Sequence, residues 1–264
     1  MSERAETIRL GGMALANGLL VHGPTHWAAA VRDRDGTLLV ASGPKLRLAR
    51  GPLGSIPLVR GVLRIGEAMA VIPAVRRALP QARLAMEEAP VGIAFAASSA
   101  MAAVARWRLR SVVAQETVGA VASLLPALVA VNRSGAARWH GVEHKSIAAY
   151  ESGTDAADAP KEHTRCGGNV ILPLLVTTVA GRSLARKLYG SPPAAVKAGV
   201  AAASVGVALE VFGFASRRPA HPVSRLVHWA GHAVQSGFST REPGAEDMEV
   251  GRAAMDEILR VESR

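Results

Sequence analysis

Cysteine is nearly absent from this chain of 264 residues, and aromatic residues are few. The single cysteine, Cys166, excludes a disulfide within the chain and fits a reducing compartment. Only 4% of the residues are aromatic, and the arginines are not interleaved with stacking side chains. This argues against nucleic acid as a partner, although the formal net charge is +10. The positive charge instead favours the anionic face of a membrane.

The first nine residues, M-S-E-R-A-E-T-I-R, lack the apolar core of a secretory signal, so no cleavable signal peptide is expected. Residues 8–49 then have a β-like pattern. Two short β-permissive runs, 28–32 and 37–41, flank D-R-D-G at 33–36, where Gly36 can supply the positive φ of a tight turn. We predict a β-hairpin here. The glycines before it indicate turns or close backbone approaches.

Residues 56–79 have apolar side chains at helical spacing and basic side chains on another stripe. This pattern predicts an amphipathic helix. Its basic face suits a membrane surface, and its apolar face equally suits packing on the hairpin.

Four apolar stretches follow, at residues 89–105, 117–131, 169–181 and 194–215. Only the last reaches the length of about 18 to 20 residues that hydropathy requires of a spanning helix, and it contains Lys197 and Glu210. Charge clusters nevertheless border each stretch, and a composition so poor in aromatic residues would not easily fill a soluble core. We therefore expect about four membrane spans. Glu210 should face the bundle interior and have a partner there, as a metal ligand or an acceptor behind one.

The distribution of basic residues predicts an orientation for these spans. With four spans, both termini and the loop between the second and third spans lie on one side of the membrane. That side holds 24 of the 31 basic residues, and the opposite loops hold the other seven: Arg106, Arg108, Arg110, Arg182, Arg186, Lys187 and Lys197. The positive-inside rule makes the first side cytoplasmic.

The loop between the second and third spans begins with H-G-V-E-H at 140–144. His140 and His144 are four residues apart and would share one face of a helix, which is a metal-chelating spacing. Glu143 occupies the position of the acid in H-x-x-E-H, where two histidines hold a metal and the glutamate moves protons. Two histidines at this spacing also occur on ordinary solvated helix faces.

Further ligands are available from His163 and Cys166, since His-x-x-Cys lets one turn present both side chains to one ion. Glu151 lies on the stripe of His144, but about 10 Å along the helix, too far to share the metal easily. A lone cysteine is more often a small buried hydrophobe, so the argument depends on the four residues occurring together. A second histidine pair, His228 and His232, has no accompanying acid or cysteine, and residues 245–264 predict an amphipathic helix.

Several motifs taken together resemble the YqhQ-like family, also called domain of unknown function 1385. They are L-G-G-M-A at 10–14, H-G-P at 22–24, I-P-L-V-R-G-V at 56–62, H-G-V-E-H-K at 140–145, H-T-R-C-G at 163–167 and T-R-E-P at 240–243. The resemblance implies a bacterial membrane protein of about four spans with a soluble N-terminal portion, labelled as a predicted metal-dependent enzyme. By motif position it assigns site roles to His140, Glu143, His144, Glu151, His163, Cys166 and Glu210.

The resulting expectation is an α+β protein in three parts. Residues 1–85 form a β-rich portion with an amphipathic helix, residues 86–218 a helical membrane region with the motif loop, and residues 219–264 a helical tail. The expected partners are the lipid bilayer and an unidentified small-molecule, lipid or peptide substrate, and a homo-oligomer is left open. We expect the protein in the bacterial cell membrane.

Two functions remain open at this stage. In the first, a divalent metal, most readily zinc, is held by His140, His144 and one residue of the second motif, and Glu143 is the general base of a hydrolase. In the second, His140, His144, His163 and Cys166 close a structural zinc site in a membrane scaffold or partner-binding protein. Around either site, Glu151, Arg165, Glu210 and Arg241 are candidates for supporting the ligands or contacting the substrate.

Overall fold

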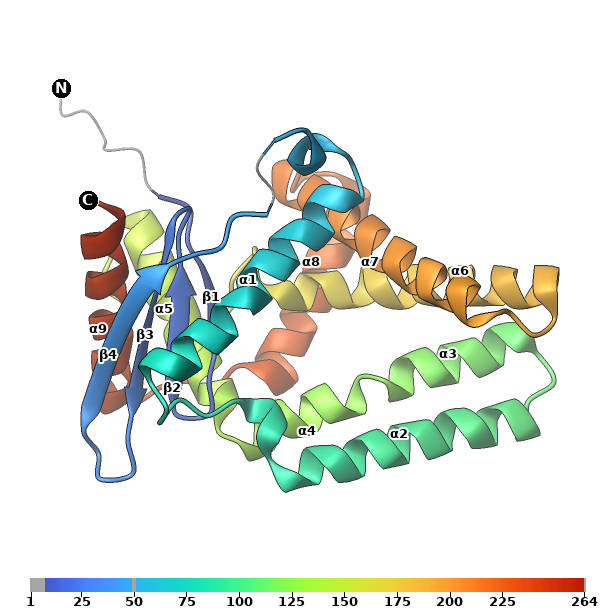
Figure 1. The fold of residues 1–264 in the computed structure, drawn as a ribbon, viewed down its shortest axis with the longest axis horizontal. Helices are drawn as coiled ribbons and strands as arrows, with labels where there is room; N and C mark the ends of the chain where they lie inside the picture. Colours follow the sequence, from blue (N-terminus) through green and yellow to red (C-terminus); the bar gives the residue numbers. More distant parts are fainter. Residues whose placement is uncertain (1–7, 49–50, 264) are drawn as a thin grey trace.

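The computed structural model of the protein describes residues 8–48 and 51–263, and consists of an N-terminal antiparallel sheet followed by a mainly helical chain (Figure 1). This confirms the predicted fold class. Most of the polar N-terminal segment, the end of the β-like region at Ala49 and the last residue, Arg264, lie outside the described residues.

The sheet is a meander in the order β1-β2-β3-β4. Its strands are β1 (Gly11–Ala14), β2 (Gly18–His22), β3 (His26–Arg32) and β4 (Leu38–Pro44). The predicted hairpin is confirmed as β3 and β4, in which Ala30 pairs with Val40 and Gly36 turns the chain with a φ of 87°. Two further strands precede it, and their pairing places Gly11 opposite His22.

Alternation of side chains along the strands gives the sheet two apolar faces. Leu19 and Val21 of β2 pack with Val142 of helix α5 (Ala136–Ser152) and Ile258 of helix α9 (Ala245–Glu262). Leu20, Trp27 and Val31 face the other way and pack against helix α1 (Val59–Ala78). Helices from the middle and the end of the chain thus cover one face, and the predicted amphipathic helix covers the other (Figure 1).

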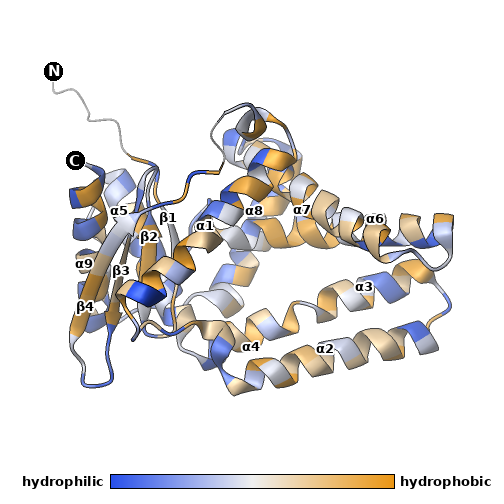
Figure 2. Cartoon of the chain, in the orientation of Figure 1, coloured by the Kyte–Doolittle hydropathy of each residue, from blue (hydrophilic) through white to orange (hydrophobic). Residues whose placement is uncertain are grey.

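Four helical segments are long and apolar enough to cross a membrane: Ala89–Arg108, Val112–Arg133, Gly167–Tyr189 and Ala194–Arg217. They correspond to the four predicted stretches. The helices in them are α2 (Ala89–Arg108), α3 (Val112–Ala122), α4 (Leu125–Arg133), α6 (Ile171–Tyr189) and α7 (Ala194–Arg217). They form two hairpins that extend from the sheet (Figure 1), and α3 contacts α6 between them. Figure 2 shows that these hairpins are largely hydrophobic along their length, with hydrophilic turns at the far ends.

The remaining elements are short or connect these parts. They are the 3₁₀-helices η1 (Pro52–Ser55), η2 (Ala85–Glu87) and η3 (Gly167–Val170), helix α8 (Pro222–Val234) and the π-helical turn η4 (Gln235–Ser239).

Glu210, the acid of the last apolar stretch, is paired with the N-terminal end of α1. Arg60 donates from Nε to a Glu210 carboxylate oxygen at 2.8 Å, and the backbone N–H of Leu58 donates to the same oxygen at 3.1 Å. Gly61 leaves space for Leu209 beside this pair, since a Cβ there would lie 2.8 Å from the Leu209 Cβ. Glu210 therefore joins α1 to α7.

Candidate metal centre

Helix α5 presents the first motif, and glycines bound it at both ends. Gly135 and Gly153 have left-handed φ values of 81° and 69°, and the Gly153 N–H donates to the carbonyl oxygen of Ala149 at 2.8 Å. Glycine adopts this conformation with little strain because it has no Cβ to clash with the backbone. Eleven of the 17 residues of α5 are buried, and Trp139, Val142 and Ile147 among them pack with the sheet and α9, so the histidines lie on a fixed scaffold.

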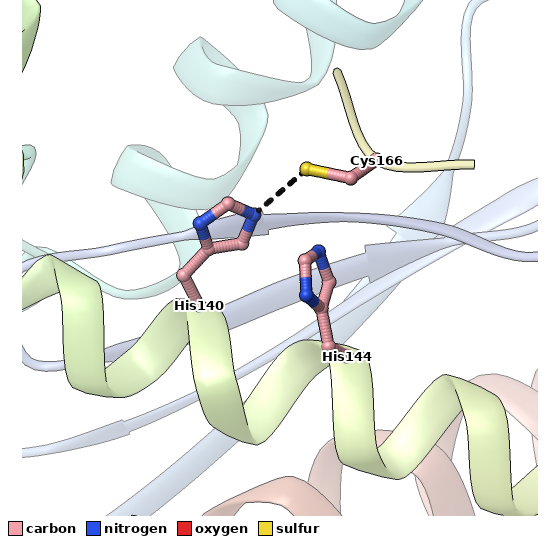
Figure 3. A group of neighbouring side chains, drawn as sticks. All are labelled: His140, His144 and Cys166. Atoms are coloured by element: carbon pink, nitrogen blue, oxygen red, sulfur yellow. Dashed lines mark hydrogen bonds between the residues drawn. The ribbon is translucent and has the colours of Figure 1, made fainter. Parts of the chain in front are cut away.

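His140, His144 and Cys166 offer ligand atoms that all lie within 4.8 Å of one another. Figure 3 shows the two imidazoles on successive turns of α5 and the cysteine reaching them from a separate segment. The His140 Nε2 lies 3.4 Å from the Cys166 Sγ. In a tetrahedral zinc site, bonds of about 2.0 to 2.3 Å place ligand atoms about 3.5 Å apart. The three residues could hold a metal ion.

Both imidazoles are oriented by backbone carbonyls. The His140 Nδ1 lies 2.8 Å from the carbonyl oxygen of Ser239, and the His144 Nδ1 lies 2.6 Å from that of Lys161. A carbonyl only accepts, so each Nδ1 carries the proton and each Nε2 keeps its lone pair. Metal-binding histidines usually have this arrangement, which fixes the ring and its tautomer.

Cys166 is buried at the start of η3, where the N–H of Gly168 donates to its sulfur at 3.2 Å. The turn is held from both sides. Gln235, buried in η4, accepts from the His163 N–H at 2.8 Å, and the Asn169 side chain donates to the Thr164 carbonyl at 2.7 Å. Neither residue was singled out from the sequence, because a lone Gln or Asn carries no pattern.

His163, the other candidate ligand, lies close to the three residues but has different partners. Its ring centroid is 5.8 Å from that of His144. Its Nδ1 accepts from the Arg165 N–H at 3.2 Å, and its Nε2 lies 3.3 Å from the Glu151 carboxylate. Arg165 also forms an ion pair with Glu151. These three predicted residues thus form a group of their own beside His140, His144 and Cys166.

Glu143 is buried against strand β1. A Cβ on Gly12 would lie 2.5 Å from the Glu143 Cγ, so only glycine lets the strand approach this side chain so closely. One Glu143 carboxylate oxygen lies 3.9 Å from the His140 Nε2. The glycines before the hairpin, among them Gly11 and Gly12, indicated a close backbone approach. The sequence did not show that the side chain in contact with Gly12 is that of Glu143.

A cavity of about 460 Å³ opens onto these groups. His140, Glu143, His144, His163 and Cys166 all line it. Burial raises the pKa of Glu143 to about 8 and that of the Cys166 thiol to about 12, and it lowers the pKa of His144 to about 3, helped by the neighbouring His140. Each shift disfavours a charged side chain. The histidines are therefore neutral, as metal ligation requires, and a cation would stabilise both acidic groups.

The T-R-E-P segment at 240–243 supports α5 from outside the cavity. The Lys145 ammonium donates to the Glu242 carboxylate at 2.6 Å, and the Arg241 N–H donates to the Ala137 carbonyl at 2.8 Å. A Cβ on Gly141 would lie 2.1 Å from the Arg241 carbonyl oxygen. The Arg241 side chain points to Asn132, at 3.3 Å. Arg241 thus contributes its backbone to this support, and Glu210 takes part in the separate pair with Arg60.

These observations define a class of protein: a sheet and two helices that enclose a His/His/Cys cluster, joined to helices long and apolar enough to cross a membrane. Residues 135–261 match the family model described as "Protein of unknown function (DUF1385)", so this region of the chain is similar to that family. The match begins at the glycine before α5 and includes His140, His144 and Cys166. No curated protein and no solved structure matches the chain.

Proposed function

We propose that this protein is a metal-dependent hydrolase that acts at the surface of the cell membrane. His140, His144 and Cys166 would hold a divalent ion. The mixture of imidazole and thiolate ligands favours zinc. The family match describes no activity, so the proposal depends on the chemistry of the site.

The observation that carries the proposal is the position of Glu143 in the same cavity as the three ligand atoms. A bound divalent ion supplies Lewis acidity and lowers the pKa of a water molecule on it. Glu143, whose carboxylate lies 3.9 Å from the His140 Nε2, would accept the proton of that water and return it to the leaving group. Three protein ligands leave a fourth position for this chemistry.

The surroundings of the cavity support a substrate at the membrane surface. Ala85, just before the first candidate span, and Val131, near the end of the second, both line the cavity. A lipid, peptide or small molecule held at the bilayer surface would reach the ligands without crossing the sheet. The excess of basic residues on this side supports a cytoplasmic orientation, with both termini on the same side.

The alternative is a closed structural zinc site with His163 as the fourth ligand. The closeness of His163 to His144 favours it, but both ring nitrogens of His163 have other partners. In that case the protein would be a scaffold or a partner-binding module.

Metal content and ligand number test the proposal. We expect about one zinc per chain in the detergent-purified protein, with X-ray absorption showing two nitrogen ligands, one sulfur ligand and one light exchangeable ligand. Azide should perturb the spectrum of the cobalt-substituted protein. His163→Ala should retain the metal. Loss of metal in this variant, with no azide response in the wild type, would support the closed site instead.

Glu143→Gln separates catalysis from metal binding. The variant keeps the size of the side chain and removes the base, so it should bind zinc and azide normally but fail to replace the wild type in cells that lack the protein. Full replacement by Glu143→Gln would exclude the hydrolase mechanism.

A further inference from the structure

A second cavity lies at the opposite end of the molecule, where the two apolar hairpins turn. Its volume is about 540 Å³. Its charged lining comes from every candidate span: Arg106 of α2, Glu116 of α3, Arg182 and Arg186 of α6, and Lys197 of α7. It is distinct from the metal centre, which lies against the sheet.

The charges in this cavity are unbalanced. Glu116 is shared by Arg186, at 3.1 Å, and Arg182, at 4.0 Å, and Arg186 also donates to the Gln115 side chain at 2.5 Å. Arg106 and Lys197 have no ion pair among the residues that the structure describes. The lining thus has four cationic side chains and one carboxylate, an excess of three positive charges among the described residues that line the cavity.

The start of α7 adds to the positive potential. Ser191 and Pro192, directly before this helix of 24 residues, line the cavity. The helix begins after Pro193 with no side-chain cap and no acid in its first turn, and Lys197 lies one turn in. Because the N-terminal end of a helix is itself partly positive, a lysine there is unfavourable unless an anion is near.

Aromatic side chains place this cavity at a membrane interface. Trp107 at the end of α2 is 76% exposed, and Tyr189 at the end of α6 is 56% exposed. Tryptophan and tyrosine are enriched at the level of lipid head groups. If the hairpins cross the bilayer, the cavity opens among the phosphates of the leaflet opposite the sheet.

We propose that this cavity binds a phosphate-bearing anion, and that the head group of an anionic phospholipid is its occupant. Arginine pairs with phosphate through two parallel hydrogen bonds, and a cluster of basic side chains between spans attracts an anionic head group in either leaflet. Because all four candidate spans contribute, the bound phosphate would hold the two hairpins together. The proposal is independent of the metal centre.

The test measures binding by the purified protein in a neutral detergent, through the shift of its thermal unfolding. Short-chain phosphatidylglycerol, phosphatidylcholine with the same chains, and inorganic phosphate are titrated separately. Arg182→Ala/Lys197→Ala removes two cavity charges. Its matched control, Arg108→Ala/Arg110→Ala, removes two charges at the same end that do not line the cavity. We expect phosphatidylglycerol to bind at least tenfold more weakly to the cavity variant and unchanged to the control.

Glu116→Gln should change the affinity for phosphatidylglycerol in the opposite direction. It therefore tests the proposal even if the double variant does not fold. Removing the only carboxylate in the lining should tighten phosphatidylglycerol binding severalfold. Stabilisation by phosphatidylglycerol but not by phosphate identifies a lipid site, and stabilisation by both identifies a small-anion site. Equal loss of binding in the cavity and control variants, or weaker binding to Glu116→Gln, would overturn the proposal.

Discussion

Helix α5 and the candidate membrane helices differ in opposite ways from an ordinary soluble helix. Eleven of the 17 residues of α5 are buried, among them Glu143, His144 and Lys145. In the four candidate spans, by contrast, only 17 to 22% of the most apolar window is buried inside the protein. Helix α5, with its ionisable side chains, is thus buried in the protein, whereas the apolar candidate spans are exposed on its surface.

Glu242 of the same chain compensates the charge of Lys145. The other buried groups of α5 and the exposed apolar helices need partners from outside the chain. Burying ionisable groups costs free energy unless charge is compensated, and the cluster on α5 has the donor set for a metal ion. Apolar helices exposed on most of their surface need a solvent other than water, and hydrocarbon is such a solvent. The comparison therefore predicts a cation at one place and lipid at the other.

The largest expected effect is the loss of metal when the α5 ligands are removed. In His140→Ala/His144→Ala, bound zinc should fall from about one per chain to near zero, because a single remaining sulfur does not hold the ion. The matched control is His228→Ala/His232→Ala, which removes a histidine pair of the same spacing on α8. Metal analysis by mass spectrometry decides, and stoichiometric zinc in the first variant would contradict the site.

A charge on the exposed surface of α2 tests the second half of the comparison. Met101, in the middle of α2, is 48% exposed, and Val40 on strand β4 is 41% exposed. In a bilayer, Met101→Asp should cost about 2.5 to 3.5 kcal/mol and impair insertion. Val40→Asp, which faces water, should be tolerated.

The measurement is the fraction of each variant that stays with membranes after a carbonate wash. If Met101→Asp and Val40→Asp behave alike, the hairpins are not surrounded by lipid.

Substitution of two helical glycines, one in α5 and one in α2, tests how tightly each helix is packed. A Cβ on Gly141 of α5 would collide with the Arg241 carbonyl, whereas Gly92 of α2 has no atom within 4 Å of the corresponding position. Gly141→Ala should therefore destabilise the protein by about 1 to 3 kcal/mol. Gly92→Ala should be neutral or stabilise it, because alanine favours a helix more than glycine does. The measurement is the melting temperature of each variant in detergent. Equal values for Gly141→Ala and Gly92→Ala would show that α5 is not tightly packed at Gly141.

The last comparison is the pH dependence of the metal-free protein. The pKa of Glu143 is about 8 in the fold and near 4.5 in the unfolded chain, so the folded state binds more protons between these values. Its stability should fall as pH rises through this window. The glutamine of Glu143→Gln does not titrate. The melting temperature of the metal-free variant minus that of the metal-free wild type should therefore increase from pH 5 to pH 8.5. A gap that stays constant with pH would contradict the burial of this carboxyl group.

Local sequence signals predicted the elements that depend on local physics. The β3–β4 hairpin follows from D-R-D-G, whose glycine takes the required positive φ. The four apolar stretches were located, although every candidate span extends beyond the stretch that its hydropathy indicated, and the second span consists of two helices, α3 and α4. Strands β1 and β2 were not separated in advance, because G-G-M-A and G-L-L-V-H are short and show no alternation. Their order comes from pairing, β1 with β2 and β2 with β3.

At the candidate site, spacing placed His140 and His144 on one helix face and brought the second motif into consideration. The spacing could not show whether His163 or Cys166 is the third candidate ligand, since that depends on where each side chain points after the chain turns. The partners of the histidines are the carbonyls of Ser239 and Lys161, which any residue could provide. Backbone partners of this kind leave no trace in a single sequence.

The pair between Arg60 and Glu210 has a consequence for how the protein is made. The two residues are 150 positions apart, and the ribosome completes α1 well before it reaches α7. The last candidate span, which carries an acid, therefore arrives when its counterion has already been synthesised. Its entry into the bilayer would then be coupled to the folding of the N-terminal portion, and Arg60→Met should leave α7 inefficiently inserted while the three earlier spans integrate normally.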